Sequence, residues 1–375
     1  MKTIGIIFHL VGWLAVPGLA AAQTPLRTAD GFAVPQPGHE FAFPRDFGSH
    51  EDFKLEWWYL TGHLFTDDGR RFGFQATFFR SARGPETASA PGMAFGAGQL
   101  FFAHMALLDV ASGKYIHQQR LNRDGWDAFA RTNALDVRNG NWSLRMTDVT
   151  NRTMALAGSV NGQGAYQLML TPRQPLVSFG RDAVSRKAAD PEAASYYLTF
   201  PRLAAAGTVT WDGVTRPVRG EAWMDHEISS SQLGTNQCGW DWCCLQFTDG
   251  REIMAYRMRQ KDGAQDPFST LVWVAPDGRL TPLDSSRFTL RPQRIWTSPA
   301  TGAKYPVSER LETYDLAGRP VVYTLEPLAD NQEMSGDRLA YWEGACRIRD
   351  AAGAEVGSAF LELTGYGKSL DLNRR

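Results

Sequence analysis

The chain has 375 residues, with 39 basic and 40 acidic side chains and a formal charge of −1. This balance leaves no electrostatic footprint for nucleic acid or for an anionic membrane surface, so both classes of partner are excluded. Aromatic residues make up 12% of the chain. Such a content is typical of proteins that fill β-barrels or line apolar pockets.

The first 22 residues have the pattern of a secretory signal. Lys2 supplies the positive start, Ile4–Val16 the apolar core, and three alanines ending at Ala22 the small-residue cleavage site. The apolar core is too short to span a bilayer of about 30 Å, and no later segment is apolar enough to cross. We therefore expect cleavage after Ala22 and a periplasmic or secreted mature protein without a transmembrane segment.

From residue 23 onwards, short β-strands dominate the pattern. Residues 23–50 carry Pro and Gly and read as an extended arm, and a hairpin follows from Trp57 to Phe78 around a turn at Thr66–Arg70. Residues 81–98 are predicted to form a mobile loop. Further strands are expected at Leu100–Val110, near Trp126, and at Trp142–Met146, Met154–Val160 and Tyr166–Leu170. Only Pro191–Tyr197 resembles a helix, so the fold class is all-β with antiparallel barrels or sandwiches.

The chain also repeats itself. The block from Trp58 to Arg70 aligns with the block from Trp240 to Arg251 at an offset of 182 residues, which falls to 181 in the turn. Towards the other end of each copy, Gly207 and Gly220 match Gly344 and Gly357 at an offset of 137. Two blocks in the same order indicate a duplicated β-domain. We expect one domain at residues 51–230, a second at 238–370, and a linker around Ser229–Gln237 between them.

The segment Asp225-His226-Glu227 lies at this seam. On a strand, Asp225 and Glu227 point one way and His226 the other. A structural histidine and an acid or base at a barrel mouth are the two alternatives. At the offset of 137, Asp225 matches Glu362 but His226 matches Leu363. A group kept in one copy only is a better candidate for chemistry than one that the fold requires.

Asp241 stands between Trp240 and Trp242, so a strand directs it away from both tryptophans. If Asp241 faces inward among aromatic side chains, desolvation raises its pKa and makes it a proton donor. If it faces outward, the two tryptophans line the cavity instead. The sequence leaves both arrangements open.

Other signatures point away from familiar catalytic sites. The sequence has no G-x-S-x-G elbow and no H-E-x-x-H helix, and Ser229–Ser231 reads as linker rather than as part of a triad. We expect no metal and no cofactor. Four cysteines are present, at 238, 243, 244 and 346. Free thiols are favoured, with a Cys238–Cys346 or Cys244–Cys346 disulfide as the alternative.

Six blocks, taken together, resemble the AttH-like family, which includes the carotenoid 1,2-hydratases. They span residues 50–367 and are Glu56–Tyr59, Phe102–His104, Trp223–Glu227, Gly239–Trp242, Tyr341–Gly344 and Leu361–Tyr366. The resemblance implies two lipocalin-like barrels in an exported protein that handles a hydrophobic molecule. It also implies an association with ABC-type export systems and the label of a predicted secreted hydrolase.

Within that resemblance, the histidine of the hydratase branch corresponds to His226. The branch also uses a tyrosine with an aspartate two positions later on one strand. The matching positions here are Tyr256 and Met258. The resemblance therefore places a methionine where the hydratases carry an acid.

Three functions follow as expectations. The first is hydration of an isoprenoid double bond, in which Asp225 or Asp241 donates the proton and His226 orients the acid or the water. The second is a non-catalytic carrier of a lipophilic ligand that serves an exporter, and a secreted hydrolase is a weaker third. The residues expected to contact the ligand are Glu56, Trp58, His104, Glu227, Trp240, Trp242 and Tyr256.

Overall fold

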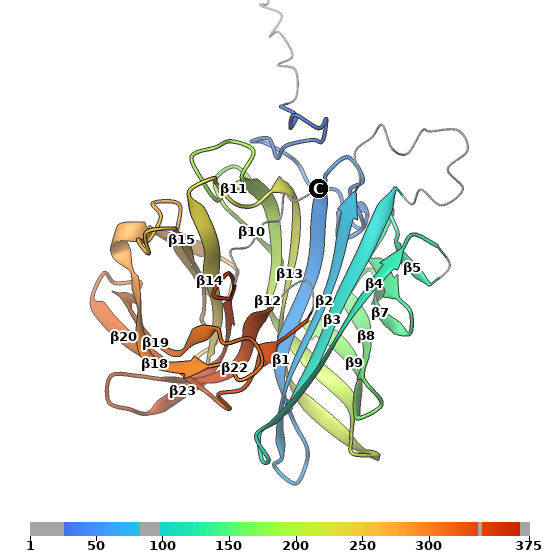
Figure 1. Cartoon of the computed structure of the whole chain (residues 1–375), viewed down its shortest axis with the longest axis vertical. Helices are drawn as coiled ribbons and strands as arrows, with labels where there is room; N and C mark the ends of the chain where they lie inside the picture. The colour runs from blue at the N-terminus through green and yellow to red at the C-terminus, as the bar shows by residue number, and fades with distance from the viewer. Residues whose placement is uncertain (1–25, 83–97, 126, 337–339, 368–375) are drawn as a thin grey trace, which may run out of the picture.

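The computed structural model describes residues 26–82, 98–125, 127–336 and 340–367. The predicted signal segment and almost all of the predicted 81–98 loop lie outside these residues. Within them the chain forms two antiparallel sheets that lie side by side (Figure 1). The prediction of an all-β fold is confirmed. No described helix is both long enough and apolar enough to cross a membrane.

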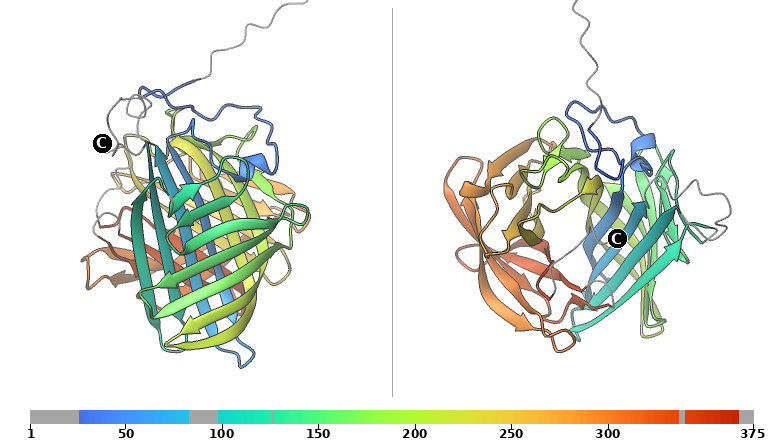
Figure 2. Two further views of the ribbon diagram at one scale, coloured as in Figure 1. Left: turned by 90° about the vertical axis from the view of Figure 1, so that its right-hand side faces the viewer. Right: turned by 45° about the horizontal axis from the view of Figure 1, so that its top comes forward.

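The first sheet is strongly curved, as its side view shows (Figure 2, left). Its strands pair in the order β4-β3-β2-β1-β13-β12-β9-β8-β7-β6-β5, and β10 and β11 both pair with β12. The strands are β1 (Leu55–Phe65), β2 (Arg71–Ala82), β3 (Gln99–Asp109), β4 (Lys114–Arg123), β5 (Ala128–Ala130), β6 (Asp136–Asn139), β7 (Trp142–Asp148), β8 (Thr153–Val160), β9 (Gly164–Pro172), β10 (Val177–Phe179), β11 (Ser185–Arg186), β12 (Ala194–Trp211) and β13 (Val214–Ser231).

The second sheet pairs in the order β17-β16-β15-β14-β23-β22-β20-β19-β18, and β21 pairs with β22. Its strands are β14 (Gln237–Phe247), β15 (Glu252–Gln260), β16 (Thr270–Val274), β17 (Leu280–Asp284), β18 (Thr289–Thr297), β19 (Lys304–Tyr314), β20 (Pro320–Pro327), β21 (Glu333–Met334), β22 (Tyr341–Arg349) and β23 (Glu355–Leu363). Two short 3-10 turns, η1 (Arg45–Phe47) and η2 (Ser285–Arg287), complete the described elements.

The strand pairing repeats in the two sheets. In each, the first long strand pairs with the last, as β1 with β13 and β14 with β23. Gly220 and Gly357, which match each other in the repeat, lie on these paired strands. A Cβ on Gly220 would come 1.9 Å from the carbonyl oxygen of His63, and one on Gly357 would come 2.3 Å from that of Gln246. Both positions therefore have no room for a side chain.

Replacing Gly220 by Ala is expected to destabilise the protein by roughly 1–3 kcal/mol or more, because the obstructing atom is backbone and cannot rotate away. Urea unfolding followed by tryptophan fluorescence measures the loss. Gly125→Ala is the matched control, since a Cβ there meets nothing within 4 Å. Equal stability of the two variants would contradict the steric explanation.

Two predictions near the seam are wrong. Pro191–Tyr197 is not helical: the chain turns at Pro191 and enters β12 at Ala194. Its β-forming residues pair with β13 on one side, which overrides any local helical tendency. Ser229–Ser231 is not linker either, because β13 continues to Ser231 and the Ser229 hydroxyl donates to the carbonyl of Ala194 at 2.7 Å.

Strand alternation divides the buried side chains into three groups. One fills the interior of the first sheet and a second fills that of the second sheet. A third group, which includes Tyr59, Tyr197, Trp223 and Trp242, packs between the two sheets. The arm joins the first group through Phe47, and Figure 2, right, shows the arm passing over one end of the first sheet. All four cysteines are free thiols.

Candidate functional site

The three residues of the seam motif face two different environments. Asp225 and Glu227 point between the sheets. There Asp225 accepts a hydrogen bond from the Tyr197 hydroxyl, and Glu227 forms an ion pair with Lys187. His226 points into the first sheet and stacks on Trp58 with ring centroids 4.8 Å apart. The structure therefore does not bring His226 together with its two neighbours in sequence.

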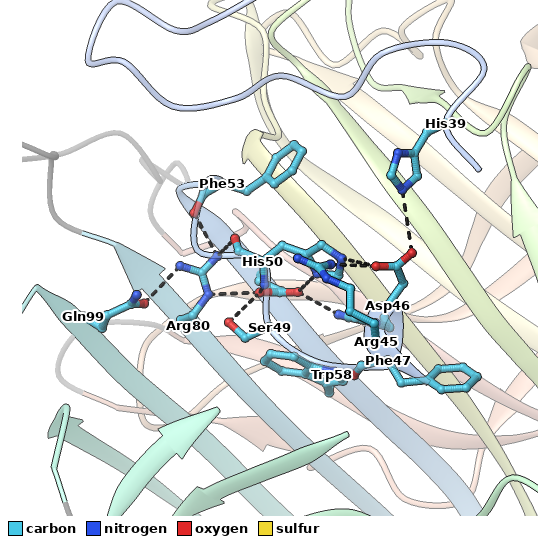
Figure 3. A network of polar contacts seen from close by, with 12 residues as sticks. His39, Arg45, Asp46, Phe47, Ser49, His50, Phe53, Trp58, Arg80 and Gln99 are labelled. Atoms are coloured by element: carbon cyan, nitrogen blue, oxygen red, sulfur yellow. Dashed lines mark hydrogen bonds and ion pairs between the residues drawn. The ribbon is translucent and has the colours of Figure 1, made fainter. Parts of the chain in front are cut away.

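On its own side, His226 belongs to a buried network around Glu56, part of which is drawn in Figure 3. The Glu56 Oε1 atom lies 2.9 Å from His226 Nε2 and 2.8 Å from His50 Nδ1. Its Oε2 atom accepts from Arg80 Nε at 3.0 Å and from Ser49 Oγ at 3.2 Å. Glu56 and Arg80 are almost completely buried, so this is an ion pair inside the protein.

The charges in this network follow from its contacts. Burial acts to raise the pKa of Glu56, but the Arg80 charge and the bonds from both histidines hold it well below its usual value. Burial also lowers the pKa of His226, against the bond from Glu56. His226 is thus a neutral imidazole that donates through Nε2. Its Nδ1 atom finds no hydrogen-bond partner among the residues that the structure describes.

On the face turned towards the second sheet, the first sheet carries two rungs, that is, two rows of residues that are paired across neighbouring strands. One rung is largely aromatic and the next is polar, and both run across neighbouring strands in register. The aromatic rung consists of Phe102, Phe79, Trp57, Glu227 and Tyr197. The polar rung consists of His104, Thr77, Tyr59, Asp225 and Thr199.

The second sheet also carries a row of paired residues on its side of this interface. The row consists of Tyr256, Trp242, Glu362 and Glu343. Hydrogen bonds join the sheets here. Tyr59 donates to Glu343 Oε1 at 2.6 Å, and Trp242 Nε1 donates to the Tyr197 hydroxyl at 2.9 Å. The predicted ligand-binding residues Trp242, Tyr256 and Glu227 thus lie in one inter-sheet site.

Asp225 is an acid in an apolar setting. Its carboxylate accepts from Thr199 Oγ1 at 2.6 Å, Tyr197 OH at 2.8 Å and Trp223 Nε1 at 2.7 Å. Burial raises the pKa of Asp225 to about 7 despite these bonds, and the nearby Glu227 charge adds to the rise. Three donors already occupy its oxygens, which leaves this side chain little room to reach a ligand.

Glu362 is an acid that the sequence reasoning did not select. Burial raises its pKa to about 8, and the charges of Glu227 and Asp225 act in the same direction. It accepts a hydrogen bond from Trp240 Nε1 at 2.9 Å. The side chain keeps some exposed surface, unlike Asp225. The internal repeat could have identified Glu362 as a candidate, because it aligns Glu362 with Asp225.

Lys187 is the second residue that was missed. It is buried, its Nζ atom lies 3.2 Å from Glu227 Oε2, and it lies over the rings of Tyr197 and Tyr256 at 4.6 and 4.2 Å. Burial acts to lower the pKa of Lys187, but the Glu227 charge raises it overall. No sequence pattern marks this lysine, because it stands in the irregular stretch before β12.

His104 also faces the inter-sheet region. Its Nδ1 atom lies 2.9 Å from the Tyr341 hydroxyl. Burial lowers the pKa of His104 to about 3, so its ring is neutral at physiological pH. It therefore serves as a hydrogen-bonding group of the inter-sheet site and not as a source of positive charge.

Asp241 points away from the first sheet, so Trp240 and Trp242 are the side chains that face it. Its carboxylate lies inside the second sheet, where Arg257 Nε donates to it at 2.7 Å and Tyr366 at 2.8 Å. Arg259 Nε is 3.1 Å away. Two guanidinium groups therefore pair with the Asp241 carboxylate. Asp241 is thus separated from Asp225 by the strand that carries it.

Glu309 shares this interior with Asp241. It is fully buried, and neither of its oxygens accepts a hydrogen bond from the described part of the chain. Burial raises the pKa of Glu309 to about 8, and the Asp241 charge adds to the rise against Arg257 and Arg259. Glu309 therefore holds its proton at neutral pH, while the same side chain in the unfolded chain is ionised.

A Glu309→Gln variant is expected to match the wild type near pH 4.5 and to be more stable by roughly 3–5 kcal/mol at pH 8. A carboxyl with a raised folded pKa costs about 1.4 kcal/mol for each pH unit between its unfolded and folded values, and Gln removes that cost. Urea unfolding at both pH values tests this, with the exposed Glu40→Gln as control. A difference that is the same at both pH values would contradict it.

Both the sequence and the fold are similar to those of known proteins. A family model described as AttH-like matches residues 34–366. A crystal structure assigned to AttH from Nitrosomonas europaea is 35% identical, covers 90% of this chain and 100% of that one, and has a TM-score of 0.80. Kievitone hydratase from Nectria haematococca is 11% identical over 89% of this chain and 97% of that one, with a TM-score of 0.68. No curated protein sequence matches significantly.

Proposed function

The chain belongs to the AttH-like family, and on that premise we propose that it binds an isoprenoid- or lipid-like molecule between its sheets and adds water to a C=C bond of that molecule. The fold shared with kievitone hydratase is compatible with hydration, but fold alone does not assign a reaction. The proposal rests on the inter-sheet site.

The observation that carries it is the Glu362 carboxyl, which accepts a hydrogen bond from Trp240 and is paired across neighbouring strands with Trp242. At pH 7 a carboxyl with a pKa of about 8 holds its proton, and Glu362 is such a group beside Trp240 and Trp242. Hydration of an alkene begins with delivery of a proton to carbon, which needs an acid of this kind in an apolar environment.

Hydration would begin with protonation of the alkene and end with capture of the resulting cation by water. The Glu362 proton forms a C–H bond with one alkene carbon, and the positive charge develops on the other carbon. Aromatic faces stabilise that charge, and Trp242 and Tyr59 meet edge to face at 5.2 Å in this region. A water oxygen then bonds to the cationic carbon, and the proton that it releases returns to the Glu362 carboxylate. The net change is one added water.

The experiment uses the full mature chain, purified from its own host. Extraction and mass spectrometry identify any co-purified ligand, and incubation with isoprenoid alkenes in heavy-oxygen water tests turnover. The expected result is a product that is heavier by one labelled water. A lipid that co-purifies but is never hydrated would reject the hydratase.

A carrier role is the second candidate, and one observation favours it. Met258 is buried beside Tyr256 in the inter-sheet group, at the position where the hydratase branch carries its acid. As a carrier, the protein would be exported, would hold its ligand on the same aromatic rungs, and would exchange it with an ABC-type exporter. The labelled-water experiment separates the two functions, because a carrier binds without turnover.

A further inference from the structure

We propose that His50, Glu56 and His226 form a binding site for one divalent transition-metal ion, of the Zn²⁺ or Co²⁺ class, in the interior of the first sheet. The site lies on the opposite face of β13 from Asp225 and Glu227. It is therefore independent of the proposed hydration, and either proposal can fail without the other.

The three side chains converge on one point. Each is more than nine-tenths buried, and their ligand atoms all lie within 4.8 Å of one another. The Glu56 Oε1 atom is 2.8 Å from His50 Nδ1 and 2.9 Å from His226 Nε2. Ligand atoms about 2.0–2.1 Å from a tetrahedral ion are about 3.3 Å apart, so each histidine nitrogen would move about half an ångström away from Glu56 Oε1 to admit the ion.

The donor set suits this class of ion. Two imidazole nitrogens and one carboxylate oxygen are ligands that Zn²⁺ and its neighbours accept, and hard ions such as Mg²⁺ prefer oxygen alone. The ion replaces the N–H protons that the histidines now direct at Glu56. The unpartnered Nδ1 atom of His226 is free to carry that ring's proton, which leaves Nε2 to coordinate as part of a neutral imidazole.

The surroundings hold the ligands in place. Glu56 turns its second oxygen to Arg80 at 3.0 Å and to the backbone N–H of His50 at 2.9 Å, so Oε1 alone faces the histidines. His50 directs its Nε2 atom at Asp46 Oδ1, 3.2 Å away. A carboxylate behind a coordinating histidine is the usual outer support of a metal site.

The arm links the site to the surface through polar contacts. Asp46 lies 3.9 Å from His39, whose side chain is 34% exposed (Figure 3). A series of polar groups therefore runs from the surface through Asp46 to His50. Sequence motifs could not reveal the site, because Glu56 and His226 are 170 residues apart and come from different strands.

The test uses the mature chain produced without a histidine tag, treated with a chelator and dialysed. Titration with Co²⁺ alone, followed by its visible absorption bands, and with Zn²⁺ alone, followed by elemental analysis, is expected to give one ion per chain. His50→Gln and His226→Gln are expected to weaken binding by about a hundredfold or more. His117→Gln, which alters a histidine outside the cluster, is the control and should bind as the wild type does.

Circular dichroism checks that each variant is folded. If a ligand variant does not fold, Asp46→Asn provides the second measurement, since loss of an outer support typically weakens binding by about 10–100-fold. Thermal denaturation of the wild type with and without Zn²⁺ is expected to show a rise in Tm. Absence of stoichiometric binding by the folded wild type, or binding that His226→Gln leaves unchanged, would overturn the site and leave a hydrogen-bond network only.

Discussion

Replacing Glu56 by Gln is expected to lower the free energy of unfolding by about 3–5 kcal/mol, the usual cost of removing one partner from a buried ion pair. The Arg80 guanidinium is 1% exposed and would lose its only counter-ion within the described network. Arg80 also donates to the carbonyls of His50 and Phe53 at 2.7 and 2.8 Å. The variant is therefore expected to loosen the arm from β2 as well.

This loss should depend on pH in a defined direction. The folded pKa of Glu56 lies well below its ordinary value of 4.5, so its contribution is complete above that pH and disappears as the pH falls through the folded value. The gap between wild type and variant should narrow in acid. Urea unfolding at several pH values measures it, with the exposed Glu51→Gln as control. A loss below about 1 kcal/mol at pH 7 would show that the pair is not the main support of this region.

The second large effect is expected at Glu362. Glu362→Gln should slow hydration by about a hundredfold to ten-thousandfold, the typical contribution of a positioned general acid. Ligand affinity should change little, because a neutral amide replaces a carboxyl that is itself neutral at pH 7, given its pKa of about 8. Rates measured with the labelled-water assay, together with the Kd for the extracted ligand, separate the two effects.

The pH profile provides an independent check. Wild-type turnover should fall as the pH rises above about 8, because the acid form of Glu362 is then lost. Glu355→Gln is the matched control, since it lies on the same strand with an exposed side chain. A Glu362→Gln variant with more than a tenth of the wild-type rate would remove Glu362 from the mechanism.

Part of the site was predictable because it depends on local pattern. The alternation at Asp225-His226-Glu227 correctly separated His226 from its neighbours, and the repeat aligned Asp225 with Glu362. The pattern could not say what either face would meet. Only the packing of two sheets brings Trp242 against Tyr197. Lys187 could not be predicted either, because it lies in an irregular segment with no alternation of apolar and polar residues.

The sequence by itself determined the all-β class, the repeated strand order and the family, because these follow from side-chain period, turn residues and ordered blocks of chain. The tertiary structure alone decided which groups share an environment. A strand fixes only that neighbours point opposite ways, and the second sheet determines which face becomes an interior. Asp241 illustrates this most clearly: the strand places it opposite two tryptophans, but only the folded chain brings Arg257, sixteen positions away, to donate a hydrogen bond to it.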